Sequence, residues 1–276
     1  DKSLVGITPA MKEGSGMVNF EKEYPERFYD VAIAEQHSVT FAAGLSLEGL
    51  KPVVAIYSTF LQRGYDQFIH DVCLENIDVT FAIDRAGIVG EDGPTHTGSF
   101  DISFMRCIPN IVISCPSNEH ELWHLLNICY EHKGPSAIRY PRGSGIGIQP
   151  IPNKVEGFEI GKARKIKDGK SVCILNFGVL MDQIDQIAEK KDYTLYDMRF
   201  IKPIDQDALE QAMQHETIIT LEDNTLLGGC GSAVGEKLHK QKFKGSLLSI
   251  GLKDEFPAHG SRNEILRQNG LDEKSI

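Results

Sequence analysis

Short apolar runs of strand length alternate with helix-length stretches along the whole chain of 276 residues. In the first half the predicted strands are Val53–Tyr57, Val79–Ile83, Ile111–Ile113 and Ala137–Tyr140, and the predicted helices run from Thr59 to about Glu75 and from Asn118 to about His132. Strands that alternate with helices in this way are typical of mainly parallel sheets covered on both faces. The chain is therefore predicted to have an α/β fold.

The same alternation resumes in the second half of the chain. The predicted strands there are Val172–Asn176, Thr194–Tyr196, Ile218–Leu221 and Leu247–Ile250, and the predicted helices lie near Leu180–Lys190, Asp205–Gln214, Gly231–Lys240 and Ser261–Gln268. Ser261 and Glu264 have the spacing of a capping box, which marks the start of the last helix. Glycines and prolines interrupt the pattern between Gly143 and Gly157. We predict two domains, residues 1–145 and 159–276, joined by a linker at residues 146–158.

Composition excludes several classes of function. The chain carries 39 acidic and 29 basic residues, a net charge of −10, so it lacks the excess positive charge with which proteins neutralise nucleic-acid phosphates. Its longest apolar runs are much shorter than the ~20 residues of a membrane-spanning helix. The six cysteines include no C-x-x-C pair, which argues against a zinc ribbon and favours reduced thiols in a cytoplasmic protein.

Two patterns have familiar chemistry but are better explained by packing. His120 and His124 form an H-E-x-x-H sequence, yet the helix phase places them opposite the apolar face, so we expect them to face solvent and not zinc. The glycine-rich segment Gly228–Val234 has valine where the dinucleotide-binding fingerprint requires its third glycine. We expect it to be a tight connection between a strand and a helix.

Charged residues gather where predicted strands end. Glu35 lies beside a short apolar run where a helix should begin, so it is either a proton-transferring carboxyl or an acidic residue favoured by the helix dipole. The loop after the strand Val79–Ile83 holds Arg85, Asp92 and His96 within a stretch of twelve residues. Because ligands of parallel sheets bind beyond the carboxyl ends of the strands, this loop is a candidate site.

A second group of arginines ends the first block. Arg139 and Arg142 lie at the end of the strand Ala137–Tyr140 and could converge with Arg85 on an anion such as a phosphate, which guanidinium groups bind with paired hydrogen bonds. The alternative is that they are surface arginines that neutralise an acidic domain.

Four of these segments carry a resemblance. The segments Phe28–His37, Tyr57–Arg63, Asp84–His96 and Arg139–Gly143 resemble, in order, the branch of the transketolase-like thiamine-diphosphate family that makes 1-deoxy-D-xylulose 5-phosphate. The resemblance covers the whole chain but only about the C-terminal half of the family's protein. It implies a pyrimidine-binding domain followed by a transketolase C-terminal domain.

The resemblance also implies roles for single residues. Glu35 matches the acid that hydrogen-bonds the cofactor's aminopyrimidine ring, and Phe60 matches the aromatic residue stacked on that ring. The acceptor-substrate positions are matched by Tyr57, Arg63, Arg85 and Arg142, with Arg85 and Arg142 at the phosphate. Asp92 and His96 match residues close to the reacting carbon.

The reaction implied by the resemblance decarboxylates pyruvate and joins the two-carbon unit to D-glyceraldehyde 3-phosphate. Its cofactors are thiamine diphosphate and Mg²⁺. The family binds the metal and the diphosphate through a G-D-G motif that this sequence lacks, because neither Asp92-Gly93 nor Asp168-Gly169 follows a glycine. We therefore expect those ligands, and catalytic competence, to come from the other half of the enzyme.

The expected setting is a homodimer in a bacterial cytoplasm, or a plastid if the source is a plant or alga, without nucleic acid or membrane. Two alternatives stay open. The chain could be the β-type subunit of a split transketolase or of a 2-oxo-acid dehydrogenase, or it could be a non-catalytic dimerisation fragment.

Overall fold

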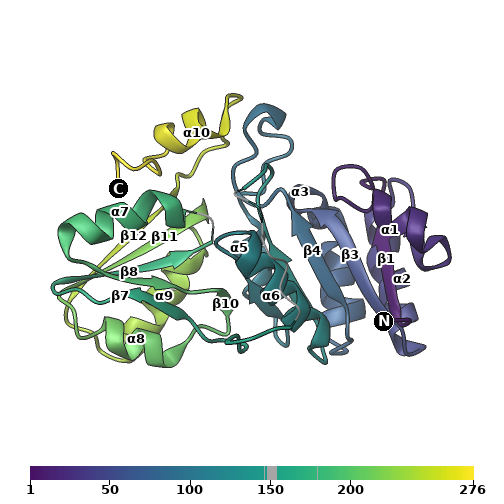
Figure 1. The fold of residues 1–276 in the computed structure, drawn as a ribbon, viewed down its shortest axis with the longest axis horizontal. Helices are drawn as coiled ribbons and strands as arrows, with labels where there is room; N and C mark the ends of the chain where they lie inside the picture. Colours follow the sequence, from purple (N-terminus) through teal and green to yellow (C-terminus); the bar gives the residue numbers. More distant parts are fainter. Residues whose placement is uncertain (146, 148–153, 179) are drawn as a thin grey trace.

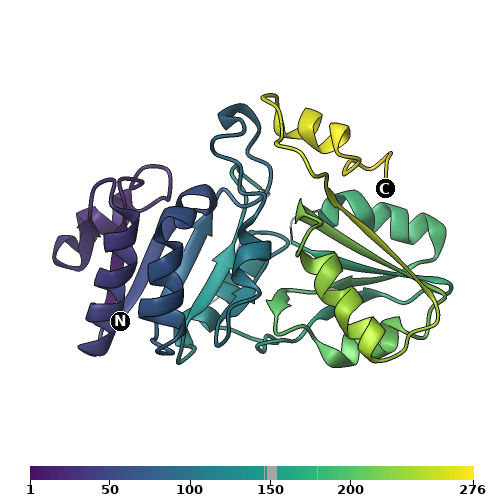
Figure 2. The ribbon, with the colours of Figure 1, turned by 180° about the vertical axis from the view of Figure 1, so that it is seen from behind.

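A computed structural model describes residues 1–145, 147, 154–178 and 180–276. The chain forms two lobes that lie side by side, one from each half of the sequence (Figures 1 and 2). Each lobe is a mainly parallel sheet with helices on both faces, so the predicted α/β fold class is confirmed. Most of the predicted linker, residues 146 and 148–153, lies outside the described residues, and the predicted domain limits stay a prediction.

Within the described part of the chain, the first sheet has the strand order β10 (Phe200–Lys202), β5 (Val112–Ser114), β6 (Ser136–Arg139), β4 (Thr80–Asp84), β3 (Lys51–Tyr57), β1 (Leu4–Thr8), β2 (Phe28–Asp30). All neighbours are parallel except β10 and β5. Successive residues of β6 point to opposite faces, Ala137 into one hydrophobic cluster and Ile138 into another. Both faces of this sheet are therefore buried, which is why its strands read as continuous apolar runs.

The helices and turns of the first lobe are α1 (Val18–Glu23), a 3₁₀ turn (Pro25–Arg27), α2 (Glu35–Leu47), α3 (Ser58–Leu61), a 3₁₀ turn (Gln62–Gly64), α4 (Tyr65–Gln67), a π-helical turn (Phe68–Cys73), a 3₁₀ turn (Gly90–Asp92), α5 (Asp101–Met105) and α6 (Glu119–Glu131). Helix α2 packs on β3 and β1, and α6 packs on β6 and β4. None of the helices among the described residues is both long and apolar enough to cross a membrane.

The second sheet, again over the described residues, has the order β12 (Ser246–Leu252), β11 (Thr217–Thr225), β8 (Val172–Phe177), β9 (Thr194–Asp197), β7 (Arg164–Lys167), with β7 antiparallel. Its helices are α7 (Met181–Lys191), α8 (Gln206–Ala212), α9 (Cys230–Lys240) and α10 (Arg262–Gln268). Helices α7 and α10 lie on one side of the sheet and α8 and α9 on the other (Figure 1). The predicted capping box of α10 is confirmed, since Ser261 and Glu264 exchange both hydrogen bonds.

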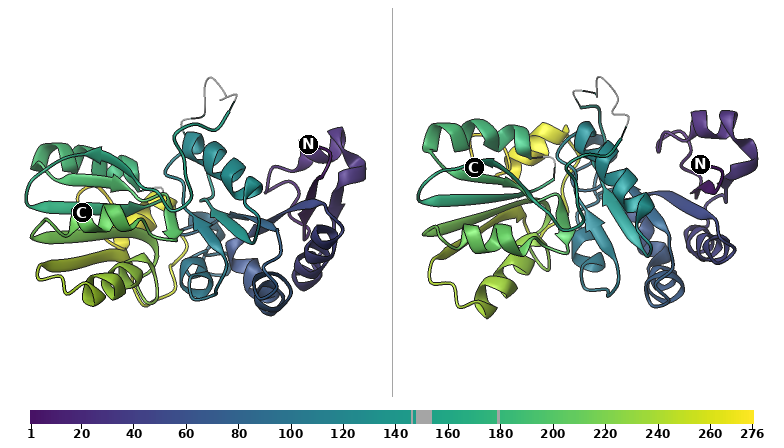
Figure 3. Two further views of the ribbon diagram at one scale, coloured as in Figure 1. Left: turned by 90° about the horizontal axis from the view of Figure 1, so that it is seen from below. Right: turned by 60° about the horizontal axis from the view of Figure 1, so that its bottom comes forward.

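The two lobes are joined more closely than their sequence pattern suggests. Strand β10 comes from the second half of the chain but pairs with β5 of the first sheet. The backbone N–H of Cys115 donates to the carbonyl of Arg199 at 2.8 Å, which extends this pairing. One hydrophobic cluster also includes Ile113 from the first sheet together with Cys173 and Leu175 from the second. The views in Figure 3 show β10 at the junction of the lobes.

The predicted long helix from Thr59 to Glu75 is wrong in one respect, because the structure divides it into α3, a 3₁₀ turn, α4 and a π-helical turn. Gly64 explains the break. A Cβ placed on Gly64 would lie 3.2 Å from the backbone oxygen of Glu35, so this residue lets the segment approach the start of α2 closely. The irregular segment thereby brings Arg63 next to Glu35.

The glycine-rich segment at 228–234 connects a strand to a helix tightly, as predicted. The buried carboxylate of Glu222 accepts hydrogen bonds from the backbone N–H groups of Cys230 and Gly231, both at 2.8 Å. A Cβ on Gly229 would lie 2.3 Å from this carboxylate, and a Cβ on Gly231 would lie 2.4 Å from Ser249 Oγ. The protein's own carboxylate thus occupies the N-terminus of α9, which dinucleotide-binding folds offer to a phosphate.

Burial raises the pKa of the Glu222 carboxyl from its ordinary value of 4.5 to about 7, against the opposing effect of the two backbone hydrogen bonds. Between these values the folded state holds a proton that the unfolded chain has lost, so this group reduces stability as the pH rises. We expect Glu222→Gln to become more stable relative to wild type from pH 5 to pH 8, by up to ~3 kcal/mol at about 1.4 kcal/mol per pKa unit. Urea unfolding across this pH range measures the difference.

The exposed Glu210 in α8 provides the control, because Glu210→Gln should leave the pH dependence of unfolding unchanged. A Glu222→Gln variant whose unfolding free energy ran parallel to that of wild type over this range would show that the dipole of α9 keeps the carboxylate ionised.

Candidate active site

The predicted site residues lie where the strands of the first sheet end. Tyr57 is the last residue of β3, Asp84 is the last residue of β4, and Glu35 is the first residue of α2. Ala32 precedes Glu35 with a φ of +56°, and its N–H donates to Asp30 at 3.0 Å. Left-handed backbone at a residue with a side chain is strained and is frequent at functional sites. The left-handed conformation of Ala32 shapes the turn between β2 and α2, the helix that begins at Glu35.

Glu35 and Arg63 form an ion pair. The Glu35 side chain is 4% exposed, and its Oε1 accepts a hydrogen bond from Arg63 Nη1 at 2.8 Å. The Arg63 side chain is 55% exposed, and its guanidinium lies 4.9 Å from the ring centroid of Phe60. A buried carboxyl is therefore paired with a solvent-facing cation that lies over an aromatic ring, an arrangement that offers a flat ligand both a stacking surface and a carboxyl group.

Phe60 lies between the two other aromatic residues of the site. Its ring stacks on Tyr57 at a centroid distance of 5.9 Å and meets His96 edge-on at 5.3 Å. His96 Nδ1 is 2.9 Å from the hydroxyl of Thr95. The structure thus brings together Glu35, Arg63, Phe60, Tyr57 and His96 in one continuous set of contacts.

Arg85 joins the same set from the next strand end. Its guanidinium lies 3.8 Å from the ring centroid of Tyr57, and it donates to the Asp84 carboxylate and, at 3.1 Å, to the carbonyl of Gly14. Arg85 has a φ of +56°, and its backbone N–H also donates to Asp84 at 2.6 Å. Burial raises the pKa of Tyr57, so this hydroxyl stays protonated and can donate a hydrogen bond at neutral pH.

Asp92 and His96 lie on a loop that is closed at its base. Gly87 and Gly98 exchange backbone hydrogen bonds of 2.8 and 2.9 Å, and a Cβ on Gly98 would lie 2.1 Å from the backbone oxygen of Arg85. Arg142 pairs with Asp92 at 3.2 Å and with Glu91 at 2.6 Å. Arg142 and Asp92 therefore form an ion pair with each other. Both charges also act on the pKa of the nearby Tyr57, which Asp92 raises and Arg142 lowers.

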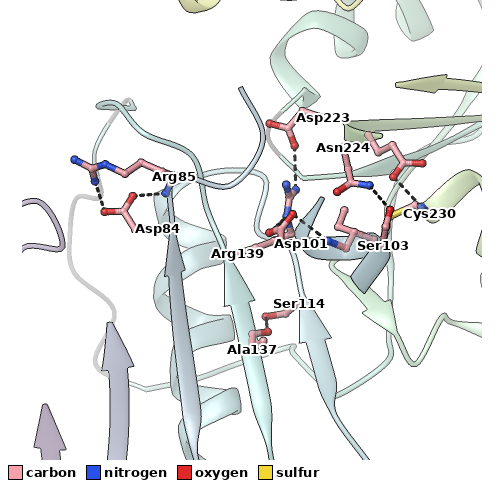
Figure 4. A network of polar contacts seen from close by, with 12 residues as sticks. Asp84, Arg85, Asp101, Ser103, Ser114, Ala137, Arg139, Asp223, Asn224 and Cys230 are labelled. Carbon is pink, nitrogen blue, oxygen red and sulfur yellow. Dashed lines mark hydrogen bonds and ion pairs between the residues drawn. The ribbon is translucent and has the colours of Figure 1, made fainter. Parts of the chain in front are cut away.

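The expectation that Arg139 converges with Arg85 and Arg142 on an anion is wrong. Arg139 is 3% exposed and donates from Nε to Asp101 at 2.8 Å and from Nη1 to Asp223 at 3.0 Å. Figure 4 shows these two carboxylates on either side of its guanidinium, well inside the junction of the lobes. Its charge is already compensated by two buried acids, so Arg139 joins the lobes and does not bind a ligand.

The prediction that both histidines of the H-E-x-x-H sequence face solvent is wrong for His124. His120 is exposed, but His124 is 4% exposed and stacks on Phe158 at 4.3 Å, and burial lowers its pKa. Sequence periodicity missed this because Phe158, the last residue of the predicted linker, packs on the helix from a distant part of the sequence. Among the described residues, no three or more His, Cys, Asp or Glu side chains gather as a metal would require.

Sequence reasoning missed two acids that organise the site. Asp84 holds both the backbone and the guanidinium of Arg85, and Asp223 binds Arg139 from the second lobe. A signal for Asp223 was available, since Glu222, Asp223 and Asn224 follow the predicted strand Ile218–Leu221 directly. Three polar residues after a buried strand indicate a functional sheet edge, and all three are buried.

Comparison with known proteins identifies both halves of the chain. The protein-family model "Transketolase, pyrimidine binding domain" matches residues 1–145, and the family model "Transketolase, C-terminal domain" matches residues 161–276. Among curated relatives, the 1-deoxy-D-xylulose-5-phosphate synthases of Idiomarina loihiensis and Cellvibrio japonicus are each 56% identical over 277 residues. The alignments cover 100% of this chain but only 44% and 43% of those proteins, so the chain spans less than half their length.

Solved structures agree with the fold. A split gene transketolase, described as an inactive beta4 tetramer, superposes with a TM-score of 0.86 at 26% identity and covers 100% of this chain and 89% of its own. A transketolase from Campylobacter jejuni superposes with a TM-score of 0.78 at 18% identity and covers 99% of this chain and 43% of its own. At 18% identity the second likeness concerns the fold alone.

Proposed function

Because the chain belongs to the transketolase family, we propose that it forms the pyrimidine-binding and acceptor-binding part of a thiamine-diphosphate-dependent transferase. The proposed reaction decarboxylates pyruvate and adds the two-carbon unit to D-glyceraldehyde 3-phosphate to give 1-deoxy-D-xylulose 5-phosphate. The names of relatives at 56% identity support this choice of substrates. The observation that carries the proposal is the buried carboxyl of Glu35 paired with Arg63, whose guanidinium lies over the half-buried ring of Phe60.

The residues present fit the pyrimidine end of the cofactor. Glu35 offers a carboxyl that is shielded from water and can hold a proton for a ring nitrogen, and Phe60 offers a flat apolar face for stacking. When bound, thiamine diphosphate supplies the stabilised carbanion that decarboxylation requires. The Arg63 side chain is 55% exposed, so its guanidinium can change position when the ring of the cofactor binds beside Glu35.

The acceptor would bind beside this ring. Arg85 and Arg142 pair with Asp84 and with Asp92, and a phosphate of the acceptor would compete for the same guanidinium donors. The ring of Tyr57 lies against the Arg85 guanidinium and stacks on Phe60. His96, in edge contact with Phe60, is placed to hold or move a proton at the acceptor's carbonyl oxygen. In this proposal Asp92 orients the acceptor.

The diphosphate and Mg²⁺ would be held by another part of the enzyme. No metal-ligating cluster occurs within residues 1–145, 147, 154–178 and 180–276, and the sequence has no G-D-G motif. We therefore propose that the active form contains a second segment, in the same or another polypeptide, and that it is a homodimer in the bacterial cytoplasm. All six cysteines are free thiols and five of them are buried, which is compatible with that compartment.

One observation favours a second candidate function. The split gene transketolase structure matches this chain over its whole length, so the chain could be the corresponding subunit of a two-chain transketolase. The release of CO₂ separates the two reactions. The complete enzyme should release CO₂ from pyruvate and form product only when glyceraldehyde 3-phosphate is added. Failure to consume pyruvate, together with transfer of a ketol group from a sugar phosphate, would contradict the synthase proposal.

Arg85 and Arg142 provide a test of phosphate binding. We expect Arg85→Ala or Arg142→Ala in the complete enzyme to raise KM for glyceraldehyde 3-phosphate by about tenfold to a hundredfold, the value of a lost charge-assisted hydrogen bond, with a much smaller effect on KM for pyruvate. Steady-state kinetics with each substrate varied in turn measures the difference. The exposed Arg267 in α10 is the matched control, and Arg267→Ala should leave both constants unchanged. Equal increases for the two substrates would mean that the arginines act on the structure of the site.

A further inference from the structure

The loop that carries Asp92 and His96 is packed against the second lobe. Ile88 is 1% exposed and belongs to the hydrophobic cluster of the second lobe, with Leu252, Ile265 and Leu266. In Figures 1 and 2 the loop rises beside α10, which begins two residues after Gly260. The loop therefore leaves the first sheet but has its apolar anchor in the other lobe.

Two glycines bring the loop and the second lobe into close contact. A Cβ on Gly90 would lie 2.9 Å from the backbone nitrogen of Arg262, and a Cβ on Gly93 would lie 2.2 Å from Nε2 of His259. Both glycines have a φ of +70°, so each is required by the backbone as well as by the available space. Asp92 lies between these two contacts, which fix its position against the segment leading into α10.

Asp223 stands at the base of the same loop. It is 1% exposed at the end of β11, and its Oδ1 accepts from Arg139 at 3.0 Å while its Oδ2 lies 3.6 Å from Arg262 Nη2. A Cβ on Gly87 would lie 2.0 Å from Oδ2, so the carboxylate touches the loop where it begins. The loop's other end is held nearby, because Thr225 donates its N–H to the carbonyl of Ser99 at 2.8 Å.

We propose that Asp223 is a positioning residue that holds the loop bearing Asp92 and His96 in its catalytic arrangement from the second lobe; this inference rests on the proposed function of that loop. Figure 4 shows the carboxylate of Asp223 aimed at the Arg139 guanidinium. Asp223 touches no site residue directly. It acts through Gly87 at the loop base, through Arg139 at the end of β6, and through Arg262 at the start of α10.

The charge of Asp223 matters because its partners are two cations, Arg139, which is buried, and Arg262, which is partly buried. In Asp223→Asn the amide oxygen can still accept a hydrogen bond from Arg139, which also keeps Asp101, but the second negative charge beside Arg139 is lost and Arg262 loses its ion pair. The loop base then has no fixed surface to rest on. A displacement of about 1 Å in groups near the reacting atoms is enough to cost up to ~100-fold in rate.

Asp223→Asn in the complete enzyme tests the proposal by hydrogen–deuterium exchange and by steady-state kinetics. The matched control is Glu121→Gln, which removes a second buried ion pair between the lobes. Glu121 accepts two hydrogen bonds from Arg199, of 2.8 and 2.9 Å, and the pair does not contact the loop. We expect Asp223→Asn to accelerate exchange in residues 88–98 and to lower kcat by ~10-fold while KM for pyruvate changes less than twofold. Glu121→Gln should leave both the loop exchange and kcat unchanged, even with an equal loss of thermal stability.

The proposal is overturned if exchange in residues 88–98 is unchanged in Asp223→Asn, or if both variants lower kcat in proportion to their loss of stability. Arg262→Gln is the second variant, because its side chain is 26% exposed and its loss is tolerated more easily if Asp223→Asn does not fold. It should show the same acceleration of loop exchange, and unchanged exchange again overturns the proposal. The exchange measurement needs no assumption about the substrates, so a wild-type enzyme without activity would contradict the proposed function and not the positioning role.

Discussion

Glu35→Gln in the complete enzyme is expected to lower kcat by about 10²- to 10⁴-fold, the usual contribution of a general acid–base group. Glutamine has nearly the shape of glutamate and can still accept a hydrogen bond from Arg63, so the fold should persist. Glutamine lacks the carboxyl group that can give or take a proton, and the residue at this position is only 3% exposed. Single-turnover and steady-state kinetics with saturating cofactor measure the loss.

The control for this substitution is Glu119→Gln. Glu119 is the first residue of α6 as Glu35 is the first residue of α2, so both changes remove the same favourable interaction with a helix dipole. Unchanged kcat in Glu119→Gln together with a matching melting temperature for the two variants assigns the loss to proton transfer. Turnover close to wild type in Glu35→Gln would remove Glu35 from the mechanism.

The second large effect concerns the 276-residue chain alone. We expect it to fold, since its two sheets are covered by buried apolar clusters that also join the lobes, but to form less than about 1% of the product formed by the complete enzyme. The proposed site addresses only one end of the cofactor, and binding of a diphosphate depends on the charge of its metal ion. Circular dichroism checks folding, and product formation from pyruvate and glyceraldehyde 3-phosphate checks activity.

Adding a separately expressed second segment is the informative half of this experiment. The part of the Idiomarina loihiensis synthase that lies outside the match to this chain is a suitable source, because the matched part is 56% identical. Activity that appears only on mixing supports a site shared between two segments. Robust activity of the 276 residues by themselves would contradict it and would require a diphosphate-binding site within this chain.

Local rules in the sequence predicted much of the fold. The alternation of strand and helix patterns identified the fold class, and Ser261 with Glu264 marked the start of α10 correctly. The patterns failed where contacts between the lobes decide the structure. Strand β10 has only three residues and exists because β5 offers it an edge, and His124 is buried because Phe158 lies on it. No window along the sequence contains that information.

The candidate site shows the same division. The cluster of charged residues after the predicted strand Val79–Ile83 found the end of β4, where Arg85 lies, whereas Tyr57, which Arg85 contacts, was named only through the resemblance. The sequence did not distinguish Arg139 from Arg142, because both lie at the end of the same strand and only the fold shows that Asp101 and Asp223 surround Arg139. The roles of the site residues came from resemblance and remain predictions for the experiments above.

Strand β10 has a further consequence for how the two lobes can move. Moving the two lobes apart would break the pairing of β10 with β5 and expose to solvent a hydrophobic cluster that includes Ile113 and Leu175. Separating the lobes would therefore cost both backbone hydrogen bonds and buried apolar surface, so the described residues favour a fixed arrangement of the two lobes. The exposed end of Arg63, in contrast, can change rotamer beside Glu35 without any movement of the lobes.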